Sequence, residues 1–207
     1  MQRTIMMLAI ALLAYSPCLQ SQLPFAFIEK TRSDEYGSIH DVAFRDDGIV
    51  FVAHGNRGIR AYRYNGSACT LLASTDHHSG TGCIALGPDD VVYAVDALGL
   101  RAYRFVDNRF VFLDRIQSGE GAWPGEVTVG PDETIFLAYG RAGIHAFRFD
   151  GISFSLVGSV NSGGIARRVA VGDNGTVFLA NDDEGLRVYR FDGASFELVT
   201  HRSDGGK

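Results

Sequence analysis

The sequence predicts an all-β fold, a β-propeller of four blades, each blade a four-stranded antiparallel sheet of about 42 residues. Three repeated features support this prediction. A seven-residue string recurs four times: GIRAYRY from Gly58, GLRAYRF from Gly99, GIHAFRF from Gly143 and GLRVYRF from Gly185. An apolar run that ends in alanine precedes each string, at Ala53, Ala94, Ala138 and Ala180. An Asn-Gly, Asp-Asn or Asp-Gly turn follows each string, and such turns join the two strands of a β-hairpin.

Each repeat unit contains four short runs rich in valine, isoleucine and aromatic residues, which favour strands. In order, they are an inner run (42–44, 84–86, 127–129, 169–171), the run ending in alanine (50–53, 91–94, 135–138, 177–180), the seven-residue string, and an outer run (69–72, 110–113, 154–157, 196–199). No ten-residue segment shows a helical period, which argues against a helical solenoid. We therefore expect blades at 39–75, 82–116, 125–160 and 167–201.

Residues 1–21 are interpreted as a signal peptide that precedes a propeller domain over 22–207. Arg3 supplies a positive charge, and Ile5–Tyr15 is an apolar run shorter than the roughly 20 residues needed to cross a bilayer. No later stretch is long and apolar enough to do so. We expect a secreted, periplasmic or cell-surface protein without a transmembrane segment, with a lipid anchor on Cys18 as the alternative.

The number of outer strands exceeds the number of blades by one. FAFI at 25–28, within an expected extra outer strand at 25–30, matches the outer runs, and the tail at 200–206 resembles the linker at 31–34. Three arrangements are open: the first part of an incomplete larger ring, a closed four-bladed ring with a displaced strand, or a half-ring that self-associates through open blade edges. In any compact arrangement we expect 25–28 and 196–199 to lie near each other.

The string VAVGDNGTVFLANDDEGLRVYRFDG at 169–193, followed by FELV at 196–199, resembles the LVIVD-repeat β-propellers. In that family a strand ending in VAV, a turn, a YVA-like strand, a Gly-Leu-Arg strand and an outer strand recur in this order. The resemblance extends over 25–207, and more distantly to YVTN-repeat and lactonase-like propellers. It implies an exported or cell-surface protein and transfers no catalytic residue. The sequence departs from the family where Asp-Gly or Asn-Gly replaces Asn-Pro, and where arginines stand at or beside the family's aspartate, at Arg63, Arg104, Arg148 and Arg190.

The loops between the second and third strands of each unit predict the ligand-binding face. Their frame is constant but their residues differ, and scaffolds commonly carry function in such loops. The expected ligand-binding residues are His54, Asp96, Tyr139, Asn181 and Asp182, together with Trp123 in a linker on the same face. We expect substitution of such surface residues to cost little stability. The alternative is a solvated loop face without a ligand.

No constellation of catalytic residues is evident, and neither a metal nor a cofactor is expected. Asp76-His77-His78 and Asp182-Asp183-Glu184 carry ligand-type side chains, but both are better explained as solvated loops. The net charge of −5 and the pI of about 5.6 argue against nucleic acid as a partner.

Two other sets of residues predict structural roles. Cys69 occupies an outer-strand position and Cys83 opens the next inner strand, so we expect two free thiols rather than a disulfide. The repeated arginines at Arg63, Arg104, Arg148 and Arg190 are expected to pair with acidic residues on an adjacent strand or blade.

Taken with the absence of a catalytic motif, the repeat favours a non-catalytic scaffold that binds an unknown protein or carbohydrate, rather than an enzyme. Two alternatives remain open. One is a lactonase-like, metal-assisted hydrolase working at the ring centre, which would require three inward-facing ligands. The other is a truncated fragment of a longer propeller protein.

Overall fold

Short segments of β-branched and aromatic residues, separated by glycine, asparagine and aspartate, form strands and tight turns along this chain. The computed structural model describes residues 38–75, 80–119 and 124–203. Within these ranges the chain forms four four-stranded antiparallel sheets, and the only helical element there is the 3₁₀ turn η2 (Asp182–Glu184). The predicted all-β fold with four four-stranded blades is confirmed.

The strands of each sheet are consecutive in the chain and neighbours in space. The first sheet contains β1 (Asp41–Arg45), β2 (Ile49–Ala53), β3 (Ile59–Tyr64) and β4 (Cys69–Ser74). The second contains β5 (Cys83–Leu86), β6 (Val91–Asp96), β7 (Gly99–Val106) and β8 (Arg109–Gln117). The third contains β9 (Val127–Val129), β10 (Ile135–Ala138), β11 (Ile144–Phe149) and β12 (Phe154–Val160). The fourth contains β13 (Arg168–Val171), β14 (Thr176–Ala180), β15 (Leu186–Phe191) and β16 (Phe196–Arg202).

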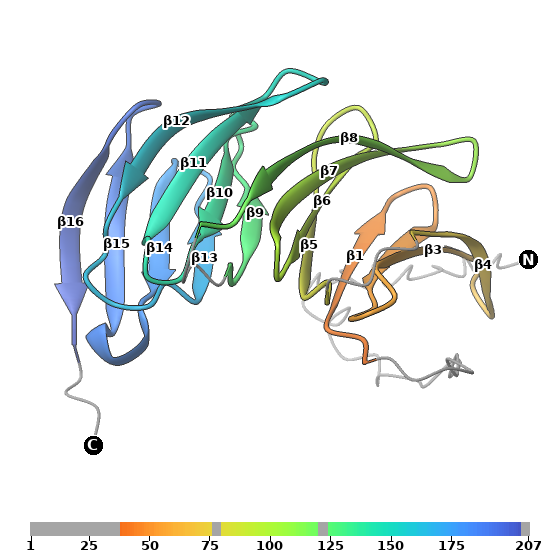
Figure 1. The fold of residues 1–207 in the computed structure, drawn as a ribbon, viewed down its shortest axis with the longest axis horizontal. Helices are drawn as coiled ribbons and strands as arrows, with labels where there is room; N and C mark the ends of the chain where they lie inside the picture. The colour runs from red at the N-terminus through yellow and green to blue at the C-terminus, as the bar shows by residue number, and fades with distance from the viewer. Residues whose placement is uncertain (1–37, 76–79, 120–123, 204–207) are drawn as a thin grey trace, which may run out of the picture.

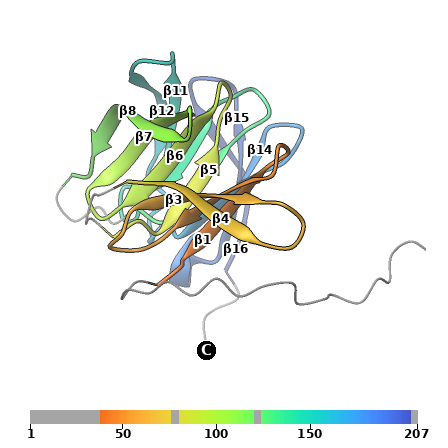
Figure 2. The same cartoon turned by 90° about the vertical axis from the view of Figure 1, so that its right-hand side faces the viewer.

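The four sheets follow one another along an open arc, with β4 and β16 at its opposite ends (Figure 1). Seen from the side of the first sheet, β1, β3 and β4 lie in front of the other sheets (Figure 2). The inner strands β1, β5, β9 and β13 contact one another in that order. The described blades therefore do not form the closed four-bladed ring that was one of the three expected arrangements. The expected signal peptide (1–21) and extra outer strand (25–30) lie outside the described residues, so the expected proximity of 25–28 to 196–199 stays untested.

An apolar core fills the space between each pair of neighbouring sheets. A buried aromatic ring from the second strand of one sheet contacts two rings of the next. Phe51 lies against Phe105 and Phe110, Tyr93 against Phe149 and Phe154, and Phe136 against Phe191 and Phe196. All but the tilted Tyr93–Phe154 pair are edge-on, and an aromatic pair adds about 0.5–1.5 kcal/mol beyond the burial of its area. Because both faces of the middle sheets are covered, their second strands β6 and β10 are buried along their whole length.

Polar side chains also join the inner strands of neighbouring blades at equivalent positions. The Asp41 Oδ2 accepts a hydrogen bond from the Ile84 amide at 2.9 Å, and the Glu126 Oε2 accepts one from the Val169 amide at 2.9 Å. At the corresponding place between them, the Cys83 thiol donates to the Val127 carbonyl at 3.9 Å. Burial raises the pKa of this thiol to about 12, so it keeps its proton. Cys69 and Cys83 are not joined in a disulfide, as predicted.

Each sheet carries an irregularity between its third and fourth strands. The register shifts at Ala61/Tyr62, Ala102/Tyr103, Ala146/Phe147 and Val188/Tyr189. One extra residue on the outer strand at each of these β-bulges bends that strand and increases its twist.

Two aspartates in the turns between third and fourth strands accept hydrogen bonds from backbone amides of the same turn. Asp150 accepts hydrogen bonds from the amides of Ile152 and Ser153, and these bonds lower the pKa of its carboxyl group. Asp192 does the same with the amides of Ala194 and Ser195.

Acidic groups lie near three of the four repeated arginines. The pKa of the Asp47 carboxyl is lowered chiefly by a hydrogen bond from Arg45, and the charge of Arg63 lowers it further. Arg148 contacts the Asp132 carboxylate at 2.7 Å, and Arg190 contacts Glu197 at 3.2 Å. Arg104 instead donates to the Gly151 carbonyl of the next blade at 3.4 Å. The expectation of an acidic partner is thus correct for Arg148 and Arg190. It is wrong for the contact between Arg104 and Gly151, because the acceptor there is a backbone carbonyl.

Candidate functional site

Four of the predicted site residues occupy equivalent positions in the four sheets. In each sheet, one residue of the second strand pairs with a residue at or just before the start of the inner strand, and the site residue follows it directly. They are His54, Asp96, Tyr139 and Asn181. Asp96 joins this set because β6 is one residue longer than the apolar run suggests. All four are at most 5% exposed. The expectation that they are surface residues whose substitution costs little stability is therefore wrong, because each side chain is buried at the end of a second strand.

Asp96 forms a buried ion pair within the second sheet. Its Oδ2 lies 2.6 Å from the Nε of Arg101, and its Oδ1 accepts the Leu98 amide at 2.8 Å. The Asp96 side chain is fully buried and that of Arg101 is 12% exposed. This pair orients the Arg101 guanidinium, because the Asp96 Oδ2 accepts from its Nε while the Leu98 amide holds the Asp96 carboxylate in place.

Tyr139 and Asn181 hold the linkers that lead into their own blades. The Tyr139 hydroxyl donates to the Gln117 carbonyl at 3.0 Å and accepts from the Gly119 amide at 3.2 Å. Asn181 donates to the Ser162 carbonyl at 2.8 Å and accepts from the Ser162 hydroxyl at 2.7 Å. Their observed contacts are thus structural, and their role in binding a ligand stays a prediction.

His54 differs from its three counterparts. Within the described part of the chain, neither of its ring nitrogens has a hydrogen-bond partner, although the side chain is fully buried. Burial lowers the pKa of this imidazole, and the nearby Arg60 guanidinium lowers it further. Burial also lowers the pKa of His145, whose ring lies edge-on to Tyr139 at 4.8 Å between centroids.

These two histidines predict that acid destabilises the protein. In the unfolded chain both take up a proton near pH 6.5, whereas in the folded chain they do so only at lower pH. Below that value the unfolded state binds more protons, so the free energy of unfolding falls as the pH falls. We expect urea denaturation to give a lower stability at pH 5.5 than at pH 7.5, with a weaker pH dependence in the His145→Gln variant. An equal or higher stability at pH 5.5 would contradict the assignment.

Of the two remaining predicted site residues, the structure describes Asp182. Asp182 lies in η2, and its carboxylate pairs with Arg167 at 2.9 Å on the exposed surface. Trp123 lies outside the described residues, as do Asp76, His77 and His78. In the described residues, no group of three or more histidine, cysteine, aspartate or glutamate side chains could hold a metal ion.

A cavity lies between the outer strands of the first two sheets, a place that sequence reasoning missed. Its volume is about 670 Å³, within the range of small-molecule sites. The lining residues are Ser74, Thr75, Arg101, Tyr103, Phe110, Phe112, Asp114 and Arg115. The two arginines Arg101 and Arg115 are visible in the sequence. Their proximity is not, because it depends on the register of β7 and β8.

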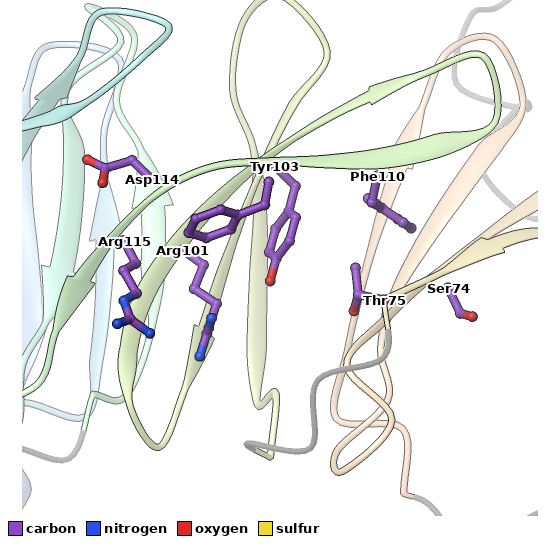
Figure 3. A pocket seen from close by; sticks show the side chains of 8 residues that line it. Ser74, Thr75, Arg101, Tyr103, Phe110, Asp114 and Arg115 are labelled. Carbon is purple, nitrogen blue, oxygen red and sulfur yellow. The ribbon is translucent and has the colours of Figure 1, made fainter.

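The cavity combines positive charge with aromatic walls. Arg101 and Arg115 are direct cross-strand neighbours, and like charges in that position repel each other. Arg101, Arg115 and Tyr103 point to the same side of β7 and β8, whereas Asp114 turns away from them (Figure 3). The Asp114 carboxylate is instead engaged with the Phe154 amide at 2.8 Å.

The aromatic wall is a cluster of edge-on rings. The Tyr103 ring lies 6.2 Å from Phe110 and 5.6 Å from Phe112 between centroids. Burial raises the pKa of the Tyr103 hydroxyl, so this group stays protonated and can donate a hydrogen bond at neutral pH. Two guanidinium groups, a phenol and flat apolar walls together suit an anionic ligand with a ring.

Comparison with known proteins places the arrangement of sheets among propellers. No protein-family model matches the chain, and no curated protein matches it in sequence. Among solved structures, a proposed 6-phosphogluconolactonase from Bacteroides uniformis aligns with a TM-score of 0.68 at 18% identity, covering 79% of this chain and 54% of its own. A second one, from Bacteroides fragilis, aligns with a TM-score of 0.67 at 16% identity, covering 82% and 56%. A catalytically inactive virginiamycin B lyase from Staphylococcus aureus aligns with a TM-score of 0.65 at 12% identity, covering 84% and 59%.

These likenesses define the class of protein as a β-propeller, and the chain spans little more than half the length of these solved structures. They also correct the expectation of a non-catalytic scaffold. Two of the similar structures are proposed 6-phosphogluconolactonases, which favours the lactonase-like alternative. The resemblance to the LVIVD-repeat family is supported only at the level of the propeller fold. In the described residues, no helix has the length and apolar character needed to cross a membrane.

Proposed function

We propose that this chain supplies four blades of a lactonase-like hydrolase that opens the ring ester of an anionic sugar lactone. The observation that carries the proposal is the cavity between the first two sheets, where Arg101 and Arg115 face each other beside Tyr103. The likeness in fold to two proposed 6-phosphogluconolactonases supports the reaction class. A phosphorylated sugar lactone is therefore the substrate to test first.

Each group in the cavity has a chemical role in this reaction. Arg101, held by Asp96, provides a fixed positive charge for the phosphate, and Arg115 adds a second charge opposite it. Water adds to the lactone carbonyl carbon and gives up a proton to solvent, so negative charge builds on the carbonyl oxygen. The protonated Tyr103 hydroxyl donates a hydrogen bond to that oxygen. When the tetrahedral intermediate collapses, the carbonyl re-forms, the ring C–O bond breaks, and the leaving ring oxygen takes a proton from solvent to become a hydroxyl group.

Arg115 is the residue on which to test this function. It is exposed, so its loss does not strand a buried charge, as the loss of Arg101 would. We expect the full chain to hydrolyse 6-phosphogluconolactone faster than the spontaneous reaction. We expect Arg115→Ala to lower kcat/KM about 10- to 100-fold, the effect of losing a charged hydrogen bond of about 1.5–3 kcal/mol.

Two controls make the result specific. Arg109→Ala removes an exposed arginine from the other end of β8 and should leave kcat/KM unchanged. Gluconolactone without the phosphate should be a poor substrate whose turnover depends little on Arg115. Hydrolysis no faster than the spontaneous rate, or equal activity of the Arg115→Ala variant and the parent, would overturn the proposal.

The location of the protein is a further part of the proposal. The apolar run at Ile5–Tyr15 supports export, and the LVIVD-like order of motifs is typical of exported or cell-surface propellers. N-terminal sequencing of the protein recovered from its host would detect removal of residues 1–21.

A further inference from the structure

The last sheet presents a face that is buried in every other sheet. Phe51, Tyr93 and Phe136 each pair with the middle of their inner strand, and each is at most 2% exposed because the next sheet covers it. Phe178 holds the same position in the fourth sheet and is 40% exposed. Leu186, whose counterparts Ile59, Leu100 and Ile144 are fully buried, is 45% exposed. We call Phe178, Ala180 and Leu186 the leading flank.

The first sheet presents the complementary face. Val42 and Phe44 of β1 are 61% and 57% exposed. The residues equivalent to Val42 in the other sheets are at most 5% exposed, because the preceding sheet covers them. They are Ile84, Val127 and Val169. We call Val42, Phe44 and Val50 the trailing flank.

All three interfaces inside the chain join a leading face to a trailing face, so the two open flanks have the chemistry to pack on each other. Their charges also match. One position at or just before the start of the inner strand is equivalent in all four sheets. It holds the series Asp41, Cys83, Glu126 and Arg168 in chain order, and the side chain of Arg168 is 70% exposed. Arg168 and Glu126 are 3.2 Å apart, so successive members of the series lie within ion-pair distance. The next member after Arg168, on a chain packed against the leading flank, would be the Asp41 of that chain.

We propose that a second copy of this chain packs its trailing flank on the leading flank, and that two copies joined at both flanks close into one ring of eight blades. Propellers of four to eight blades are the common sizes. Each interface repeats the aromatic and apolar packing found between the sheets of a single chain, and each adds an Arg168–Asp41 pair between copies. This inference is independent of the proposed hydrolase activity.

Sedimentation equilibrium of the full chain tests the proposal. The expected mass is twice the 22.5 kDa of the chain. Phe178→Asp and Val42→Asp each place a carboxylate in both interfaces of the ring, and each should weaken dimerisation at least about 100-fold, as for a central interface residue. Leu156→Asp is the matched control, because Leu156 is 55% exposed on the outer strand β12 and lies on neither flank. Circular dichroism of each variant verifies that it is folded.

A mixing experiment separates this proposal from a general loss of association. The Phe178→Asp chain keeps an intact trailing flank, and the Val42→Asp chain keeps an intact leading flank. Mixed together, the two monomeric variants should form a heterodimer through one intact interface. A monomeric parent at 100 µM, a dimer insensitive to both variants, or a mixture that stays monomeric would overturn the proposal. Masses that keep growing with concentration would show open head-to-tail chains and overturn ring closure.

Discussion

Replacing Asp96 with alanine is expected to lower the free energy of unfolding by about 3–5 kcal/mol, the usual cost of removing one partner of a buried ion pair. The carboxylate is fully buried and lies 2.6 Å from the Arg101 Nε. Its removal leaves the guanidinium with little access to water and no acidic partner at that nitrogen. It also strips the Leu98 amide of its acceptor.

The Arg167–Asp182 pair is the natural control. It has similar geometry, at 2.9 Å, but its side chains are 58% and 37% exposed. Arg167→Ala should therefore cost only about 0–1 kcal/mol. Urea denaturation of both variants measures the difference, and equal losses would show that burial does not set the strength of the Asp96–Arg101 pair.

The Gly143→Ala variant should be destabilised by about 3 kcal/mol or more. Gly143 has φ of +85°, and a Cβ there would lie 2.0 Å from the Val160 carbonyl oxygen of the neighbouring strand. The variant therefore combines backbone strain of about 1–3 kcal/mol with a steric displacement of comparable cost. Neither backbone segment can move without opening the hydrogen bonds between β11 and β12.

Gly175→Ala isolates the contribution of backbone strain. Gly175 has a similar φ of +75°, but no atom lies within 4 Å of the position of an added Cβ. We expect this turn variant to lose about 1 kcal/mol. Thermal and urea denaturation compare the two, and a Gly143→Ala variant as stable as Gly175→Ala would contradict the steric argument.

The glycine that opens the seven-residue string illustrates what the sequence could predict. Its recurrence at Gly99, Gly143 and Gly185 placed the third strand of the last three blades correctly. The reason for the recurrence was not visible, because the carbonyl that crowds each glycine belongs to the outer strand, some 17 residues further along. Repeats predict local structure well, and contacts across a sheet depend on register.

The candidate site shows the same division. The repeat predicted one equivalent position for His54, Tyr139 and Asn181 and the next position for Asp96, whereas the pairing of β6 places Asp96 level with the other three. Their burial depends on linkers that fold back over them, as Ser162 does over Asn181. The cavity with Arg101 and Arg115 was missed because an irregularity at Ala102/Tyr103 sets which residues of β8 face β7. A one-residue shift in pairing changes the face of every side chain beyond it.

The four β-bulges carry a consequence for solubility. The outer strands β4, β8, β12 and β16 are the free edges of their sheets, and a straight free edge can recruit strands from other chains. A bulge at the same place in every blade bends that edge and interrupts its row of amides and carbonyls. We expect this interruption to protect the blades against edge-to-edge growth into fibrils, while the leading flank and the trailing flank stay open to packing.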